Sequence, residues 1–309
     1  MKNYSTVRPA LPTKWLLVLA ILFLVAVIER IYGIDRQSLW SDELYAVVAS
    51  YKPWLGAWQD MVADSHPPGY LTFMYFTLPL TGYSEFGVRL HALLFGLAWI
   101  PLVFVLCRRW FGVNAALMAV AVVASAYNAV YYSQEARAYS MLIVFNVWNV
   151  FCLLEILFSD SQKKKHQVGF VISTTMMLYL HYAGFVFMCA EVLLCILLRV
   201  FCKRSSWRML GGIFSIPLLL YSPWLGVMYN NLVDAPRNWA VSSVPTMKET
   251  YFVMQRLLAP DDAHMRFHCI VLLLVFVFAI GLRIKQGSSR QLAVIFSLLW
   301  LLVIPILAF

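Results

Sequence analysis

The chain has 309 residues, of which 62% are hydrophobic and only 13% are charged. Soluble globular domains are nearer half apolar and a quarter charged, so this composition excludes an ordinary soluble domain and indicates a protein that crosses a membrane several times. The net charge of +9 is not interpreted as a surface for nucleic acid, because excess Lys and Arg in such a protein mostly marks its cytoplasmic loops.

Apolar runs predict an all-α fold, a polytopic bundle of about nine transmembrane helices. Each run has nearly the length that a helix needs to cross about 30 Å of hydrocarbon. The runs are 15–31, 86–107, 113–129, 138–158, 168–181, 183–201, 210–228, 267–283 and 292–309. Residues 70–80 are also apolar, but they are too few for a comfortable span and are bracketed by prolines. We therefore expect an interfacial juxtamembrane helix there.

Charge predicts the orientation of the bundle. If residues 70–80 do not cross, the basic pair 108–109 and the lysine run 163–165 lie on the same side as the N-terminus. The positive-inside bias then places the N-terminus in the cytoplasm. Two large loops, 32–85 and 229–266, are expected on the outer (periplasmic) face of a plasma (inner) membrane, and long polar loops are where function is expected.

Two parts of the chain are expected to differ in role. Residues 1–228 are predicted to form a transmembrane catalytic module that includes the outer loop 32–85. Residues 229–309 are predicted to supply the second outer loop and further spans. Because the last run ends at Phe309 with no polar tail, we expect the chain to be truncated at its C-terminus.

Adjacent carboxylates stand just beyond the first span, in "LWSDELYAVVASYKPW" (39–54). A plain structural interpretation is that Ser41 and Asp42 cap a juxtamembrane helix. However, carboxylates close to lipid are costly unless they are used or paired. This favours a role for Asp42 and Glu43 as a general base or as ligands of a divalent cation.

A second polar motif, "DSHPPGY" (64–70), lies in the same outer loop. His66 precedes a proline, which holds it in an extended conformation and directs its imidazole away from the chain. A solvated histidine in an interfacial turn is an equally good interpretation of the motif. Tyr70 ends the motif at the start of the short apolar segment.

Two further polar motifs reach the same membrane face. "YYSQEARAYSM" (131–141) carries Glu135, Arg137 and Tyr139, and "LYLHYAGF" (178–185) carries His181 and Tyr182. Glu135 fits an ion pair that anchors a helix end. Arg137 runs against the charge bias, and a guanidinium at the headgroup level is a natural partner for a lipid phosphate.

Two other charged features have mainly structural interpretations. Glu85 and Arg89 are spaced i, i+4 at the outer end of the second run, which favours a helix pair. Glu191 lies in the middle of a run and must face the bundle or a partner. The sequence has no P-loop, dinucleotide fingerprint, zinc motif or nucleophile elbow, so any reaction must be driven by the leaving group of its own substrate.

The motifs "SLWSDELYAV", "DSHPPGYL", "SEFGVRLHALLFG", "YYSQEARAYSML" and "LYLHYAGF" occur in this order within residues 15–200. With these motifs in this order, the chain resembles the polytopic glycosyltransferases of the C-type superfamily that use polyprenyl-phosphate sugars. The protein mannosyltransferase-like group, which includes the lipid A aminoarabinose transferase, is the most similar. The resemblance implies transfer of a hexosyl or pentosyl group, with inversion, to a hydroxyl of a glycan, lipid or protein during synthesis of lipopolysaccharide or cell-wall glycan.

The resemblance also implies roles for matching positions. Asp42 is expected to be catalytic with Glu43 adjacent, while Arg137 and a protonated His181 are expected to offset charge on the lipid phosphate. The residues expected to bind substrate are His66, Tyr70, Arg89, Glu135, Arg137, Tyr139, His181 and Tyr182. Some members of the superfamily use a divalent cation, which Asp42, Glu43 and His66 would hold here.

A transporter or flippase for lipids or sugars is the alternative function. Such a protein would account for the many spans and for the intramembrane Glu191. It is expected to show internal repeats and Gly- or Pro-broken helices near the membrane midplane. No repeat is apparent, and the polar residues gather at one face instead.

Overall fold

The structure is a computed structural model, and it describes residues 11–159, 163–202 and 206–234. These residues are helical, with no strand among them. The helices are α1 (Thr13–Ile31), α2 (Ser41–Ser50), α3 (Trp54–Ala63), α4 (Gly69–Thr81), α5 (Glu85–Trp110), α6 (Val113–Ser125), α7 (Tyr127–Tyr131), α8 (Tyr139–Phe158), α9 (Lys163–Leu180), α10 (Ala183–Cys202) and α11 (Trp207–Asp234).

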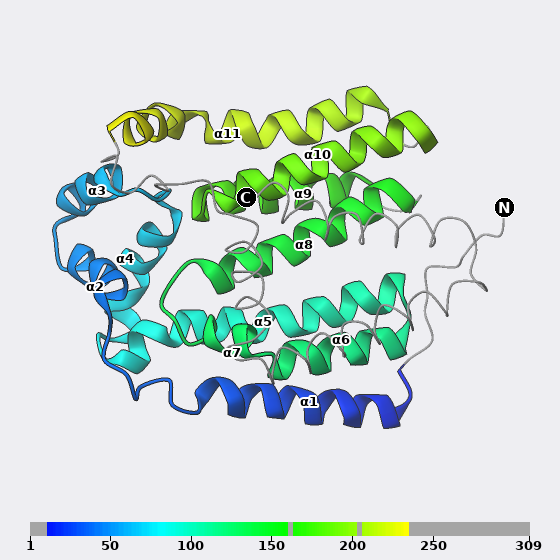
Figure 1. Ribbon diagram of the computed structural model, residues 1–309, viewed down its shortest axis with the longest axis horizontal. Coiled ribbons are helices and arrows are strands. Elements are labelled where there is room, and N and C mark those ends of the chain that lie inside the picture. The colour runs from blue at the N-terminus through cyan, green and yellow to red at the C-terminus, as the bar shows by residue number, and fades with distance from the viewer. Residues whose placement is uncertain (1–10, 160–162, 203–205, 235–309) are drawn as a thin grey trace, which may run out of the picture.

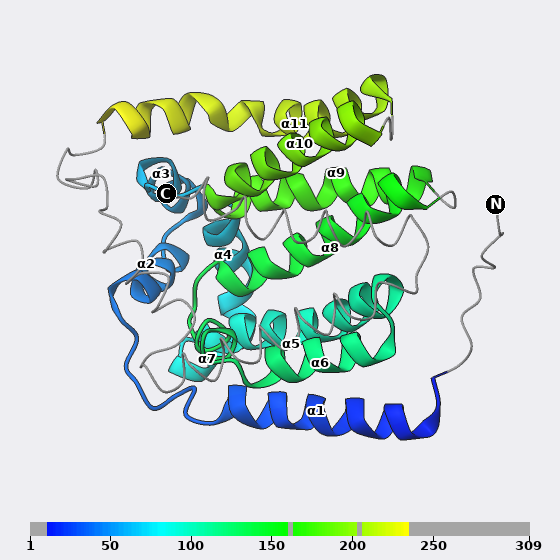
Figure 2. The same cartoon turned by 45° about the vertical axis from the view of Figure 1, so that its right-hand side comes forward.

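The long helices α1, α5, α6, α8, α9, α10 and α11 lie side by side in a bundle (Figure 1). The short helices α2, α3 and α4 gather at one end of it, which we call the loop end (Figures 1 and 2). We call the opposite end, where α9 and α11 begin, the basic end. Four described helices are long and apolar enough to cross a membrane: α5, α8, Ala183–Val200 of α10 and Trp207–Asn231 of α11. The prediction of a multi-pass all-α protein is thus confirmed.

The predicted runs match the long helices closely. The first seven runs correspond in order to α1, α5, α6, α8, α9, α10 and α11, and the short apolar segment 70–80 is α4. The runs 267–283 and 292–309 lie outside the described residues, as does most of the loop 229–266.

Two of the differences between the helices and the predicted runs have a visible reason. The run 113–129 is divided after Ser125, because the guanidinium of Arg30 donates hydrogen bonds to the carbonyls of Val123 and Ala124 at 2.8 Å each. Those carbonyls would otherwise accept from the next helical turn. α11 continues past residue 228, where Asn231 Nδ2 donates to the carbonyl of Asp64 at 2.7 Å and so holds α11 against the end of α3.

An apolar cluster fastens the loop end to the bundle. Ala57 of α3, Met61 of α3, Met74 and Leu78 of α4, and Met177 of α9 are fully buried in it. Fully burying a Met or Leu side chain stabilises the fold by roughly 1.5–3 kcal/mol. The short helices are therefore fixed parts of the fold, and the polar residues that they carry have defined positions.

Glu191 faces the bundle interior, as predicted, and its partner is Asn149 of α8. With the amide of Asn149 oriented by its neighbours, Nδ2 donates to Glu191 Oε1 at 2.6 Å while Oδ1 accepts from Ser173 and Thr174 of α9. Glu191 is 0% exposed. This network joins α8, α9 and α10 inside the bundle.

Candidate active site

The two adjacent carboxylates in the first turn of α2 lie in different environments. Adjacent residues of a helix point about 100° apart, so only one of the pair can face the bundle. The side chain of Asp42 remains 41% exposed, whereas that of Glu43 is 0% exposed. Glu43 also accepts from the backbone N–H of Trp40 at 3.3 Å, which closes the start of the helix.

Glu43 and Arg89 form a buried clamp between α2 and α5. Arg89 Nε donates to Glu43 Oε1 at 2.9 Å, and Nη2 donates to Oε2 at 2.7 Å. Arg89 Nη1 donates to the carbonyls of Ile34 and Gln37. The N–H of Ala136 donates to Glu43 Oε1 at 2.8 Å. Such bidentate, charge-assisted bonds are the strong ones in proteins, so the clamp joins α2, α5 and the segment before α8.

The clamp contradicts one expectation and bears on two others. Arg89 was predicted to pair with Glu85, but its guanidinium turns toward α2, where Glu43 offers both oxygens. Arg89 was also predicted to bind substrate, and it is only 5% exposed with its N–H groups already donated. Glu43 was predicted to be catalytic, and its buried oxygens leave no face for a substrate. We therefore expect both residues to position their neighbours rather than to contact substrate.

The segment 132–138, which carries Arg137, is held from the opposite side by α1. Arg30 Nε donates to Ser133 Oγ at 3.1 Å, and Gln134 Nε2 donates to the carbonyls of Arg30 and Tyr32 at 3.0 and 2.9 Å. Arg30 is fully buried. Sequence reasoning missed Arg30 and Gln134. Arg30 nevertheless carries the signal that singled out Arg137, since it is a cation at the loop end of an apolar run.

Residues far apart in the chain meet at the loop end in what we call the polar cluster. It consists of Asp42, Asp64, His66, Arg137, Tyr139 and His181. Arg137 Nη1 lies 3.3 Å from Asp42 Oδ2, and Arg137 Nη2 lies 3.5 Å from His66 Nε2. His66 Nδ1 lies 3.4 Å from Asp64 Oδ1.

Aromatic rings complete the polar cluster. The ring of His181 lies 5.7 Å from that of His66 and 5.7 Å from that of Tyr139, measured between centroids. The cluster therefore draws on α2, on the turn before α4, on the start of α8 and on the turn between α9 and α10. The structure thus brings the four predicted motifs together.

Burial opposes the protonation that was expected of His181. Burial, followed by the charges of His66 and Arg137, lowers the pKa of His181 to about 4. The backbone N–H of Ala183 also donates to His181 Nδ1 at 3.0 Å. Nδ1 is then an acceptor, so the proton of the neutral ring is on Nε2. His181 can offer one uncharged N–H to an anion.

Glu135 was expected to form an ion pair at a helix end or to bind substrate, but the nearby Arg137 pairs with Asp42. Glu135 is 8% exposed, and its buried Oε2 has no hydrogen-bond partner among the described residues. Burial, followed by the charge of Glu43, raises the pKa of Glu135 to about 7. This carboxyl therefore exchanges its proton near neutral pH.

The two remaining predicted tyrosines lie at the edges of the cluster. The hydroxyl of Tyr70 is buried without a hydrogen-bond partner in the described part of the chain, and burial raises the pKa of Tyr70. Tyr182 follows His181 in the turn between α9 and α10, and its hydroxyl is shielded from solvent.

The residues predicted to hold a divalent cation do not fit one. Within residues 11–159, 163–202 and 206–234, no group of three or more His, Cys, Asp or Glu is arranged to bind a metal ion. Of the predicted set, Glu43 is closed off by Arg89, and Arg137 contacts both Asp42 and His66. A cation there would have to displace a guanidinium, so we derive no step through a metal.

Residues 65–226 match the family model for dolichyl-phosphate-mannose-protein mannosyltransferase. The match spans more than half of the chain. The chain belongs to this family. The resemblance to the protein mannosyltransferase-like group that the sequence motifs suggested is thereby confirmed. No curated protein matches the chain.

Solved structures of polytopic membrane proteins share the fold of this family member. ArnT from Cupriavidus metallidurans bound to undecaprenyl phosphate has a TM-score of 0.63 at 17% identity, over 96% of this chain and 58% of that one. The S. cerevisiae Pmt1–Pmt2 complex bound to the sugar donor has a TM-score of 0.53 at 19% identity, over 72% and 33%. At such identities the likeness shows the fold. The chain thus spans 58% of the length of ArnT and a third of that of the yeast protein.

Proposed function

We propose that this chain is the catalytic module of an integral membrane glycosyltransferase that moves a sugar from a polyprenyl-phosphate donor to an acceptor hydroxyl. The contact between Asp42 and Arg137 beside two imidazoles carries the proposal. It places a solvent-accessible carboxylate next to a cation suited to phosphate. Family membership supports the proposal, as does the fold shared with proteins solved with undecaprenyl phosphate or a sugar donor.

Asp42 is assigned the role of general base. The acceptor oxygen attacks the anomeric carbon and forms the new glycosidic bond, while the bond from that carbon to the phosphate oxygen breaks. The proton of the acceptor hydroxyl passes to Asp42, and the electron pair leaves with the polyprenyl phosphate. Direct attack of this kind inverts the anomeric carbon. The 41% exposure of the Asp42 side chain leaves room for an acceptor.

Arg137 and His181 are assigned to the leaving group. Groups that are already aimed at the position of developing charge are effective catalysts, since they need not reorganise during the reaction. Arg137 contributes a full charge, and His181 contributes an uncharged N–H from Nε2. Arg137 also contacts Asp42, with Nη1 3.3 Å from Oδ2. A donor phosphate that binds Arg137 therefore releases Asp42 for proton transfer.

The remaining assignments follow from charge and from the length of the chain. The segregation of Lys and Arg supports a cytoplasmic N-terminus, so the loop end faces the outer, periplasmic side of a plasma membrane. Residues 1–228 then form the catalytic module. The acceptor is a hydroxyl of a glycan, a lipid or a protein.

The contacts of Glu191 argue against the transporter alternative. Glu191 was the main sequence feature in favour of a transporter, because intramembrane acids often mark a transport pathway. Here it is fully buried and bonded to Asn149. Its role in joining three helices is sufficient to account for an acidic residue at this position.

A transfer assay with labelled polyprenyl-phosphate sugars on the full-length protein tests the proposal. Asp42→Asn removes the base and keeps the shape of the side chain, so we expect the rate to fall by roughly 10²- to 10⁴-fold. Asp35→Asn is the matched control, because Asp35 is an exposed acid of the same loop outside the polar cluster. Transfer by Asp42→Asn at the wild-type rate would remove Asp42 from this role.

A further inference from the structure

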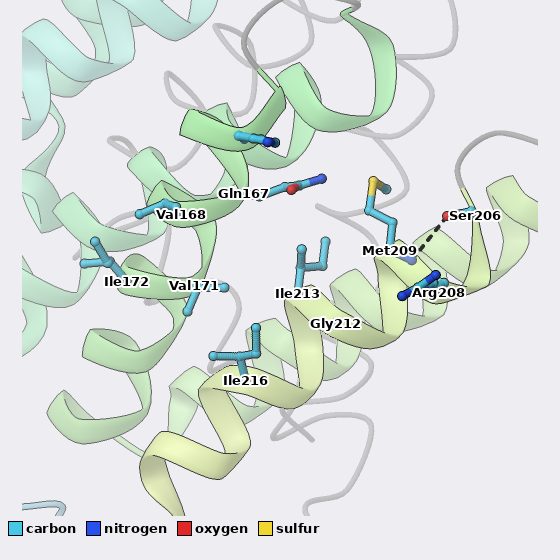
Figure 3. Close-up of a pocket in the computed structure, with 11 residues that line it drawn as sticks. Gln167, Val168, Val171, Ile172, Ser206, Arg208, Met209, Gly212, Ile213 and Ile216 are labelled. Carbon is cyan, nitrogen blue, oxygen red and sulfur yellow. Dashed lines mark hydrogen bonds between the residues drawn. The ribbon is translucent and has the colours of Figure 1, made fainter.

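A groove runs between α9 and α11 at the basic end, opposite the polar cluster. Its volume is about 700 Å³. Apolar side chains from both helices form most of it, and they are Val168, Val171, Ile172, Met209, Ile213 and Ile216. Figure 3 shows Gln167, Ser206 and Arg208 toward one end of the groove and Val171, Ile172 and Ile216 toward the other.

We propose that this groove binds an anionic phospholipid of the leaflet at the basic end, with an acyl chain along its apolar walls and the phosphate between Lys164 and Arg208. The inference goes beyond the proposed function, because the donor phosphate is assigned to the opposite end of the bundle. It therefore concerns a different leaflet and a different ligand.

The charges at the groove complement an anionic headgroup. Lys164 belongs to the first turn of α9 and Arg208 to the first turn of α11, and both are exposed. No acidic residue lines the groove in the described part of the chain, and no ion pair is formed there by either cation. Basic residues near the membrane surface attract anionic lipids, and the stems of Lys and Arg lie well along apolar surface.

Both helices also present their N-terminal ends at this point. The partial positive charge of a helix N-terminus favours an anion within the first turn. The hydroxyl of Ser206 already accepts from the N–H of Met209 at 3.2 Å (Figure 3). The cations thus supply the binding energy, and the helix dipoles add to it.

Gly212 keeps the groove open. It lines the groove, and an added Cβ at this position would meet nothing within 4 Å among the described residues. Gly211 precedes it, is equally unobstructed, and does not line the groove. The two glycines therefore provide a matched pair of sites for a test that fills the groove.

Lipid binding to the purified full chain tests the charge requirement. Native mass spectrometry would compare phosphatidylglycerol with phosphatidylcholine of the same acyl chains. We expect Lys164→Gln and Arg208→Gln each to weaken binding of phosphatidylglycerol about fivefold. Lys14→Gln, which removes an exposed charge at the same end of the bundle, should leave it unchanged. Equal binding of the two lipids, or no effect of the two variants, would overturn the proposal.

Filling the groove provides an independent test. We expect Gly212→Leu to abolish the phosphatidylglycerol adduct and Gly211→Leu to retain it. Both replacements improve helix propensity similarly, so the thermal unfolding temperatures of the two lipid-free variants should agree. If Gly212→Leu alone lowers that temperature, a segment of residues 235–309 fills the groove in the full chain, and the lipid proposal is wrong.

Discussion

Asp42 and Glu43 are neighbours in the chain with different environments. Glu43 is buried against Arg89, whereas Asp42 faces Arg137 with its side chain 41% exposed. This difference follows from the angle between successive residues on α2. One carboxylate therefore fixes the position of the helix, and the other remains available for chemistry.

Glu135 should make stability depend on pH. Its pKa is raised from an ordinary value of 4.5 to about 7, so the folded protein holds this proton more tightly than the unfolded chain does. The resulting stabilisation is complete below about pH 4.5 and is lost as the pH rises through 7. Glu135→Gln resembles the protonated form, so it should lose less stability than wild type between pH 5 and pH 8.

Thermal unfolding of wild type and Glu135→Gln in the same detergent at pH 5, 6, 7 and 8 would measure this change of stability with pH. His181 acts in the opposite sense, since its lowered pKa makes stability rise with pH between about 4 and 6.5. Both proteins contain His181, so its contribution cancels in the comparison. Parallel pH profiles for wild type and Glu135→Gln would contradict the prediction.

The sequence was informative about which residues gather but not about how they pair. Asp42, His66, Arg137 and His181 could be selected because polar groups at an outer membrane face need a reason to be there. The partner of Arg89 could not be predicted, because Glu43 is 46 residues away and the nearby Glu85 satisfies the local spacing rule. Such pairing depends on how α2 folds back over α5.

At the scale of elements, the clamp between Glu43 and Arg89 should contribute strongly to stability. Glu43→Gln leaves a buried guanidinium without its counter-charge, and breaking such a pair costs about 3–5 kcal/mol. Asp60→Asn is the control, since it removes an acid from the more exposed pair with Lys52 and should cost less than about 1 kcal/mol. Chemical unfolding of the purified variants would measure both.

A double variant separates the charge from the shape of the clamp. Glu43→Gln combined with Arg89→Met removes both charges, so it should be less destabilised than Glu43→Gln alone. If the double variant is the less stable of the two, the uncompensated charge of Arg89 is not the cause of the loss.

The helices themselves were largely predictable, because apolar runs of membrane length have few other solutions. Their ends were less so. The division between α6 and α7 depends on Arg30 reaching the carbonyls of Val123 and Ala124 from α1, a contact across more than 90 residues. Sequence periodicity contains no such information.

At the scale of the whole molecule, the two ends of the bundle have opposite characters. The loop end collects acids, imidazoles and aromatic rings, and the basic end collects Lys and Arg at the ends of its helices. A reporter fused after Leu80 should be located outside the cytoplasm, and the same reporter fused after Arg109 should be located inside it. An outside location for Arg109 would overturn the proposed orientation, and with it the outer-face site.

The buried clamp has a consequence for biosynthesis. Glu43 leaves the ribosome 46 residues before Arg89, so the acid has already been synthesised when Arg89 of α5 reaches the insertion machinery. The pair can form as soon as α5 enters the bilayer, before the N–H of Ala136 has been synthesised. We therefore expect Arg89 to enter the membrane already paired with a carboxylate.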